Sequence, residues 1–146
     1  MTARSARRVA WSVGLASIAL MVAGLVFRFL DRSTTLPHLS DAWSVGGVFD
    51  VVANLTLPFF GIVIVSRRRE NPIGWLFLVA GFTLALASFS HSYALHTLVA
   101  DPGSLPGGHA LAWLATWVEP IAIVLLPWLL LLFPTGHLPS PRWRPL

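Results

Sequence analysis

Residues 73–99, IGWLFLVAGFTLALASFSHSYALHTLV, form an apolar run that contains no aspartate, glutamate, lysine or arginine. Because a helix rises about 1.5 Å per residue, the run is long enough to cross a hydrocarbon layer roughly 30 Å thick. Similar runs lie at 9–30, 43–65 and 110–133. The sequence therefore predicts an all-α, polytopic membrane protein. Residues 1–146 would form a single module of four transmembrane helices, packed as an antiparallel bundle.

The composition agrees with this fold class and excludes several kinds of chemistry. The chain is 55% hydrophobic and only 11% charged, too little charge to cover the surface of a soluble domain. It has no cysteine, which excludes disulfides and thiolate metal sites. It also lacks a phosphate-binding glycine loop, a GxSxG motif and an HExxH motif, and its loops are short. We therefore expect that the chain itself is not an enzyme and has no cofactor.

The arginines predict the orientation in the membrane. Eight of the ten basic residues lie in three segments beside the apolar runs: Arg4, Arg7, Arg8, Arg67, Arg68, Arg69, Arg142 and Arg144. The positive-inside rule then places the N-terminus, the loop 66–72 and the tail 134–146 in the cytoplasm of a plasma-membrane protein, an N-in, C-in topology. We expect these arginines to contact anionic lipids at the cytoplasmic face. No basic groove with interleaved aromatic residues indicates nucleic-acid binding.

Two local patterns predict how the helices begin and pack. Asn71-Pro72 places an N-cap residue before a proline at the first helical position, which is typical of a sharp helix start. Small residues recur at every third or fourth position, a spacing that lets membrane helices approach closely. One such stripe is Gly81, Ala85, Ser88 and Ser92, and another is Ser12, Ala16, Ala19 and Ala23. Both stripes are predicted to face other helices.

Four polar residues interrupt the apolar runs at a similar depth: Asp50, Asn54, His91 and Glu119. From the helical rise, the three ionisable groups lie roughly 10–14 Å below the outer face. A charge at such depth costs at least ~2.5 kcal/mol, so each side chain should face the bundle interior. They predict either a pocket that senses protons, a cation or a small polar ligand, or hydrogen bonds that only join helices. His91 and His96 do not share a helical face, so no metal site is expected, and His96 is expected at the membrane interface.

Three stretches resemble a known family. RRRENPIGWL at 67–76 resembles an "R-x-x-NPIGWL" helix entry, and FPTGHLPSPRWRP at 133–145 is similar to an "FPTGRLPSPRWRP" turn. DPGSLPGG at 101–108 looks like a "PGSLPGG" outer loop. All three occur in the membrane-embedded N-terminal regions of actinobacterial sensor histidine kinases. The resemblance covers about residues 67–146, and His137 stands where that pattern has arginine.

The resemblance implies a sensory module of a two-component signalling protein, which passes a signal to a cytoplasmic kinase domain and works as a homodimer. The phospho-accepting histidine, asparagine box and glycine-rich nucleotide lid of such kinases are missing, so the chain would be truncated before the kinase core. Two other hypotheses stay open. The chain could be a small multi-pass protein that binds or carries a solute or protons, or a structural membrane partner that acts through helix packing.

Overall fold

The computed structural model describes residues 3–33 and 45–132. Four long helices fill this part of the chain: α1 (Ala3–Leu30), α2 (Val45–Arg67), α3 (Pro72–Leu95) and α4 (Gly108–Leu132). A 3₁₀ turn, η1 (Asp31–Ser33), follows α1, and a π-helical turn, η3 (His96–Ala100), follows α3. No strand occurs among the described residues. The predicted all-α fold is confirmed for these ranges.

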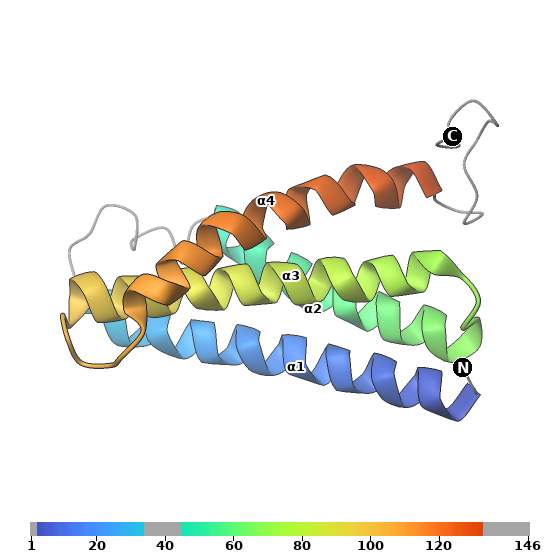
Figure 1. Ribbon diagram of the computed structural model, residues 1–146, viewed down its shortest axis with the longest axis horizontal. Helices are drawn as coiled ribbons and strands as arrows, with labels where there is room; N and C mark the ends of the chain where they lie inside the picture. The colour runs from blue at the N-terminus through green and yellow to red at the C-terminus, as the bar shows by residue number, and fades with distance from the viewer. Residues whose placement is uncertain (1–2, 34–44, 133–146) are drawn as a thin grey trace.

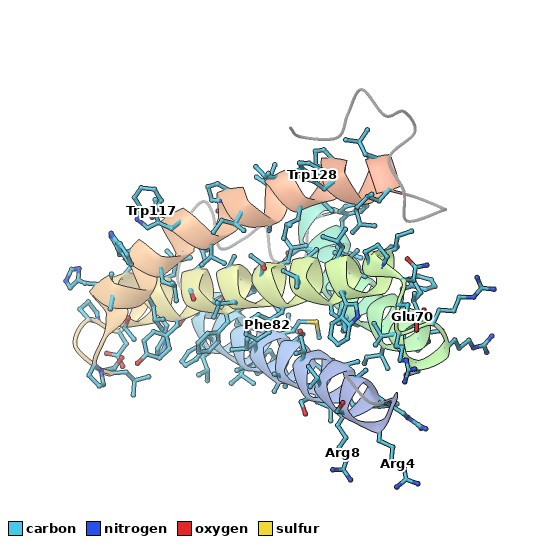
Figure 2. All side chains as sticks on the ribbon, turned by 45° about the vertical axis from the view of Figure 1, so that its right-hand side comes forward. Arg4, Arg8, Glu70, Phe82, Trp117 and Trp128 are labelled. Carbon is cyan, nitrogen blue, oxygen red and sulfur yellow. The ribbon has the colours of Figure 1, made fainter. Side chains whose placement is uncertain are left out.

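Successive helices run in opposite directions, and α3 lies at the centre (Figure 1). It packs against α1, α2 and α4, whereas α4 packs mainly on α3 and η3. The N-terminus of α1 and the turn between α2 and α3 share one end of the molecule, where Figure 2 labels Arg4, Arg8 and Glu70. We call this the arginine end. The other end, with η1, η3 and the loop 101–107, is called the loop end.

All four long helices are long and apolar enough to span a membrane. Many large apolar side chains point outward, including Trp117 and Trp128 on α4 (Figure 2). Soluble proteins rarely expose contiguous apolar surface on this scale. The structure therefore supports a multi-pass integral membrane protein. The tail 134–146, with Arg142 and Arg144, lies outside the described residues.

The predicted start of α3 is confirmed. Asn71 is the N-cap, and its side-chain oxygen accepts a hydrogen bond from the backbone N–H of Ile73 at 3.0 Å. Pro72 follows at the first helical position. A backbone N–H there has no acceptor within the helix, so proline, which lacks the N–H, loses no hydrogen bond. A purely local sequence pattern thus sets the sharp turn at the arginine end.

Glycines bring α2 and α3 together towards the arginine end. A Cβ added at Gly61 would stand 2.8 Å from the backbone nitrogen of Leu78, and one at Gly74 would stand 2.8 Å from side-chain carbons of Ile64 and Val65. Ala10 on α1 joins Val65 and Leu78 in an apolar cluster beneath this contact. The core at this end is close-packed hydrocarbon.

One of the two predicted small-residue stripes is confirmed and the other is wrong. On α3, Gly81, Ala85 and Ser92 are buried. On α1, Ser12, Ala16 and Ala19 are exposed, and the helix packs through a different face that includes Ala6, Ala10, Gly14, Ser17 and Gly24. Small residues lie on several sides of α1, so their spacing alone does not identify the side that meets α2 and α3.

Candidate functional site

An arginine of α1 joins three helices at the loop end. The guanidinium of Arg28 donates from Nη2 to Oδ2 of Asp50 on α2 at 3.0 Å, an ion pair. The same nitrogen donates to Oγ of Ser88 on α3 at 2.8 Å, and Nε donates to Oγ of Ser92 at 3.1 Å. The side chains of Arg28 and Asp50 are 20% and 34% exposed, so the pair is partly shielded from solvent. We call Arg28, Asp50, Asn54, Ser88 and Ser92 the Arg28 network.

The acceptors of Arg28 are themselves held by hydrogen bonds within and between helices. The amide of Asn54, buried on α2, donates to Oδ1 of Asp50 at 2.8 Å and to its backbone carbonyl at 2.9 Å. The Ser88 hydroxyl donates to Oδ2 of Asp50 at 3.2 Å, and that of Ser92 donates to the Ser88 carbonyl at 2.9 Å. Spacing of four residues places Asn54 with Asp50, and Ser92 with Ser88, on one helical face, whereas the bond from Ser88 to Asp50 joins α3 to α2. These bonds fix the acceptors in position for the guanidinium.

A cavity of about 200 Å³ opens beside the Arg28 network. Arg28, Asp50 and Ser88 line it together with His91 of α3 and Glu119 of α4. The structure thus places the three predicted ionisable residues, Asp50, His91 and Glu119, around one cavity. The fourth predicted residue, Asn54, lies one turn away from it and supports Asp50.

The two sides of the cavity differ in their bonding. Asp50 has Arg28, Ser88 and Asn54 as partners. His91 and Glu119 are both exposed, and within ranges 3–33 and 45–132 neither side chain forms a hydrogen bond or ion pair. The site therefore joins a bonded charge pair to two ionisable groups that are open to a ligand or to water.

A second polar contact lies nearer the loop 101–107. Nδ1 of His96, in η3, is 2.7 Å from Oδ1 of the buried Asp31 in η1. The His96 ring packs on Phe27, with centroids 5.1 Å apart. The His96 side chain is mostly buried between the helices. Its expected place at the membrane interface concerns depth in the bilayer and stays a prediction. The π-helical turn, a geometry often found at functional sites, places His96 in this position.

Sequence reasoning missed Arg28, which organises the site. The available signal was an arginine inside an apolar run, which needs a buried partner in a membrane. Ser88 and Ser92 were predicted as packing residues, and they also accept hydrogen bonds from the guanidinium. Asp31 was missed because it lies just beyond the apolar run.

The other charged residues within 3–33 and 45–132 lie on the surface. Arg4, Arg7, Arg8, Arg67, Arg68 and Arg69 are exposed at the arginine end. Arg69 is 3.9 Å from Glu70, a loose contact between exposed side chains. Among the described residues, no group of three histidine, aspartate or glutamate side chains is arranged to hold a metal ion.

Comparisons of the chain with protein-family models, with curated proteins and with solved structures found no match.

Proposed function

We propose that the chain is a membrane-embedded sensory module whose input site is the Arg28 network with the adjoining cavity. The observation that supports this proposal is that one guanidinium on α1 donates hydrogen bonds to acceptors on both α2 and α3. A ligand or proton that changes the charge beside Arg28 would alter the contacts of three helices at once. Such a local electrostatic change acts as a signal when the helices have two arrangements that bind it differently.

The distribution of polar groups favours sensing over transport. The described side-chain contacts between charged or ionisable residues in the helical core, Arg28–Asp50 and His96–Asp31, both lie at the loop end. Towards the arginine end, the described core is made of apolar clusters, one around Leu78 and one around Ile73 and Leu129. A solute that crossed the membrane would need polar partners along its whole path.

Transport of protons or a small solute is a second candidate. One observation favours it, namely that two ionisable residues, His91 and Glu119, line an open cavity. If the cavity binds no ligand, the remaining hypothesis is a structural membrane partner that acts through helix packing. The experiments below separate the three.

The proposal includes an orientation. With the arginine end in the cytoplasm of a plasma-membrane protein, the cavity would open towards the outside. Exposed arginines at the arginine end would contact anionic lipids. The resemblance of residues 67–76 and 101–108 to sensor histidine kinases supports a link to two-component signalling and to a homodimeric state. A coding sequence that continues in frame into a kinase core would support this link, and an in-frame stop after Leu146 would oppose it.

The sensory proposal is tested by measuring helix movement at the end opposite the cavity. Because the chain has no cysteine, spin labels can be placed at Ser12→Cys on α1 and Ser66→Cys on α2, both exposed. Pulsed electron spin resonance in lipid nanodiscs would compare about pH 8 with about pH 5, the interval in which histidine commonly changes charge. We expect the distance between the labels to change with pH.

Variants identify the groups responsible for that change. Arg28→Gln and the double variant His91→Gln, Glu119→Gln should abolish it, and Arg4→Gln, at an exposed arginine of α1, should preserve it. Identical distances at both pH values would contradict proton sensing. Pyranine-loaded liposomes give the transport readout. Proton flux above that of empty liposomes, lost in Glu119→Gln, would favour transport instead.

A further inference from the structure

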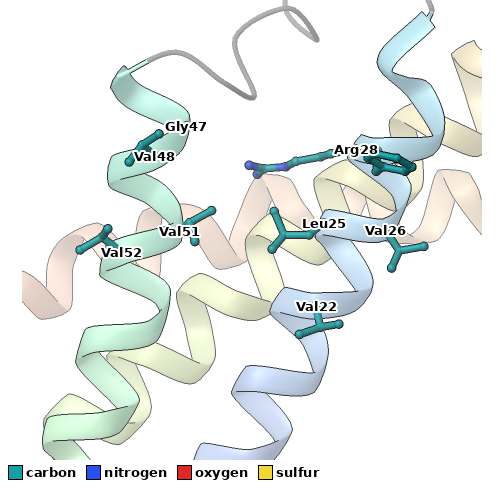
Figure 3. Close-up of a pocket in the computed structure, with 9 residues that line it drawn as sticks. Val22, Leu25, Val26, Arg28, Gly47, Val48, Val51 and Val52 are labelled. Carbon is teal, nitrogen blue, oxygen red and sulfur yellow. The ribbon is translucent and has the colours of Figure 1, made fainter.

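We propose that a lateral groove between α1 and α2 at the loop end binds one acyl chain of an anionic phospholipid, with the headgroup at Arg32. The groove has a volume of about 440 Å³, and Arg28 is among the residues that line it (Figure 3). This volume falls in the range of small-molecule pockets. The site stands independently of the sensory proposal.

The walls of the groove suit a hydrocarbon chain. Val22, Leu25 and Val26 of α1 line one side, Val48, Val51 and Val52 of α2 line the other, and Leu25 and Val51 point into the space between the helices (Figure 3). Both walls are helices that are candidates to span the membrane, so a chain lying between them would run roughly along the bilayer normal. Val26, Val48 and Val52 are half exposed, which leaves the groove open to the side where lipid lies.

The charge at one end of the groove suits an anion. The Arg32 guanidinium lies 4.0 Å from the ring centroid of Phe29, a residue that lines the groove. Arg32 is exposed, and no carboxylate in the described ranges forms an ion pair with it. The nearby carboxylates of Asp50 and Asp31 are engaged by Arg28 and His96. The groove therefore has a positive end and apolar walls, the complement of an anionic lipid.

Arg28 gives the groove a boundary that is not apolar. Its side chain extends from α1 towards α2, above Leu25 in Figure 3, and it lines both the groove and the polar cavity. Because Arg28 lines both spaces, it lies between them. Its charge is paired with Asp50, so Arg32 is the arginine left to contact a headgroup. A phospholipid fits this arrangement better than a helix of a second copy, which would bring its own side chains against the Arg32 charge.

Lipid retention tests the proposal. The full chain would be exchanged into detergent with phosphatidylglycerol or phosphatidylcholine of identical chains, and bound lipid counted by native mass spectrometry. We expect preferential retention of phosphatidylglycerol. Because one basic residue near a membrane contributes about 1 kcal/mol, Arg32→Gln should reduce that preference about fivefold. Arg4→Gln, at the arginine end, is the matched control and should leave the preference unchanged.

Filling the groove tests the acyl-chain contact. Val48→Trp should lower retention of both lipids, and Val52→Trp provides a second variant if the first does not fold. Val124→Trp on α4 is the control, since Val124 is 59% exposed against 53% for Val48. Equal retention of both lipids by the unmodified chain, or equal loss in Val48→Trp and Val124→Trp, would overturn the proposal. So would a Val48→Trp variant that changes oligomeric state but retains lipid, because the groove would then hold a second copy. None of these readouts depends on the pH response of the helices.

Discussion

The two ends of the helix bundle are held together by different forces. At the arginine end, α2 and α3 touch through Gly61 and Gly74, and the contacts are those of hydrocarbon against hydrocarbon or backbone. At the loop end, α1, α2 and α3 are joined by the hydrogen bonds and ion pair of Arg28. Close apolar packing resists small displacements, whereas a polar network can exchange one partner for another.

This difference assigns separate roles to the two ends. A proton, ion or lipid that binds at the loop end changes the electrostatic interactions of the ionisable residues there. The arginine end then moves as a packed unit, since its glycine contacts leave no room for local adjustment. The following predictions test whether charged contacts stabilise the loop end and close packing stabilises the arginine end.

The largest effect is expected from removing the Arg28 charge. Arg28→Met loses three hydrogen bonds and leaves the Asp50 carboxylate, partly buried, without its cation. Breaking one partner of a buried ion pair costs 3–5 kcal/mol, and the partial exposure here places the expected loss near the lower bound, about 3 kcal/mol. Chemical unfolding in mixed micelles measures the loss.

The control for this prediction is a double-mutant cycle. Asp50→Leu in the Arg28→Met background should recover part of the lost stability, because both charges are then absent. Strictly additive effects of the two substitutions would mean that Arg28 and Asp50 do not stabilise each other, and the loop end would not be held by charge.

A smaller loss is expected from adding one methyl group at the arginine end. In Gly61→Ala the new Cβ would lie 2.7 Å from Cγ of Leu78 and 2.8 Å from its backbone nitrogen, so α2 and α3 must separate. Overpacking costs 1–3 kcal/mol, of which the higher helix propensity of alanine offsets part, leaving about 2 kcal/mol. Unfolding in the same micelles measures it.

Gly24→Ala on α1 is the matched substitution nearer the loop end. Its Cβ would lie 3.3 Å from the nearest atom, the Cα of Phe89, so a shift of a few tenths of an ångström accommodates it. We expect a change below about 1 kcal/mol. A Gly24→Ala variant that unfolds as readily as Gly61→Ala would show that tight packing is not confined to one end.

The sequence predicts the four helices well because each signal is local. An apolar run long enough to span a membrane needs no knowledge of its neighbours, and the same holds for the cap at Asn71. The depth of Asp50, His91 and Glu119 follows from counting residues along a helix, and the structure places all three at one cavity.

The partners of these residues could not be predicted in the same way. Depth gives no rotation about the helix axis, and apolar residues on every side of α1 hide which face is buried. This is why Arg28 was not paired with Asp50, and why the stripe at Ser12, Ala16 and Ala19 was assigned to the wrong side. Both errors concern contacts between helices, which depend on tertiary packing.

A local effect is expected from removing the helix cap at the arginine end. Asn71→Ala loses the hydrogen bond from the Ile73 N–H, and N-cap removal typically costs about 1 kcal/mol. Hydrogen exchange should accelerate at the first turn of α3 and stay unchanged at η3. Ser66→Ala, at an exposed residue near the end of α2, is the control. Unchanged exchange in Asn71→Ala would mean that Pro72 alone sets the helix start.

The smallest effect is expected at the opposite end, from Tyr93→Phe. The Tyr93 hydroxyl donates to the carbonyl of Pro106 at 2.7 Å, and its ring packs on Phe27 with centroids 5.2 Å apart. Phenylalanine keeps the ring contact and loses the hydrogen bond, a change of about 1 kcal/mol or less at an exposed site. Amide exchange in the loop 101–107 should accelerate while global stability stays within about 1 kcal/mol.

Trp75→Phe is the matched change at the arginine end, where the indole Nε1 donates to the carbonyl of Arg69 at 3.0 Å. Each substitution removes one side-chain bond to a turn, so the two variants compare the ends directly. If the loop end is the more adaptable, Tyr93→Phe should also change the pH response of the spin-labelled chain, whereas Trp75→Phe should not. Equal effects on that response would remove the distinction between a responsive end and a packed end, because both turns would then be coupled to the cavity to the same degree.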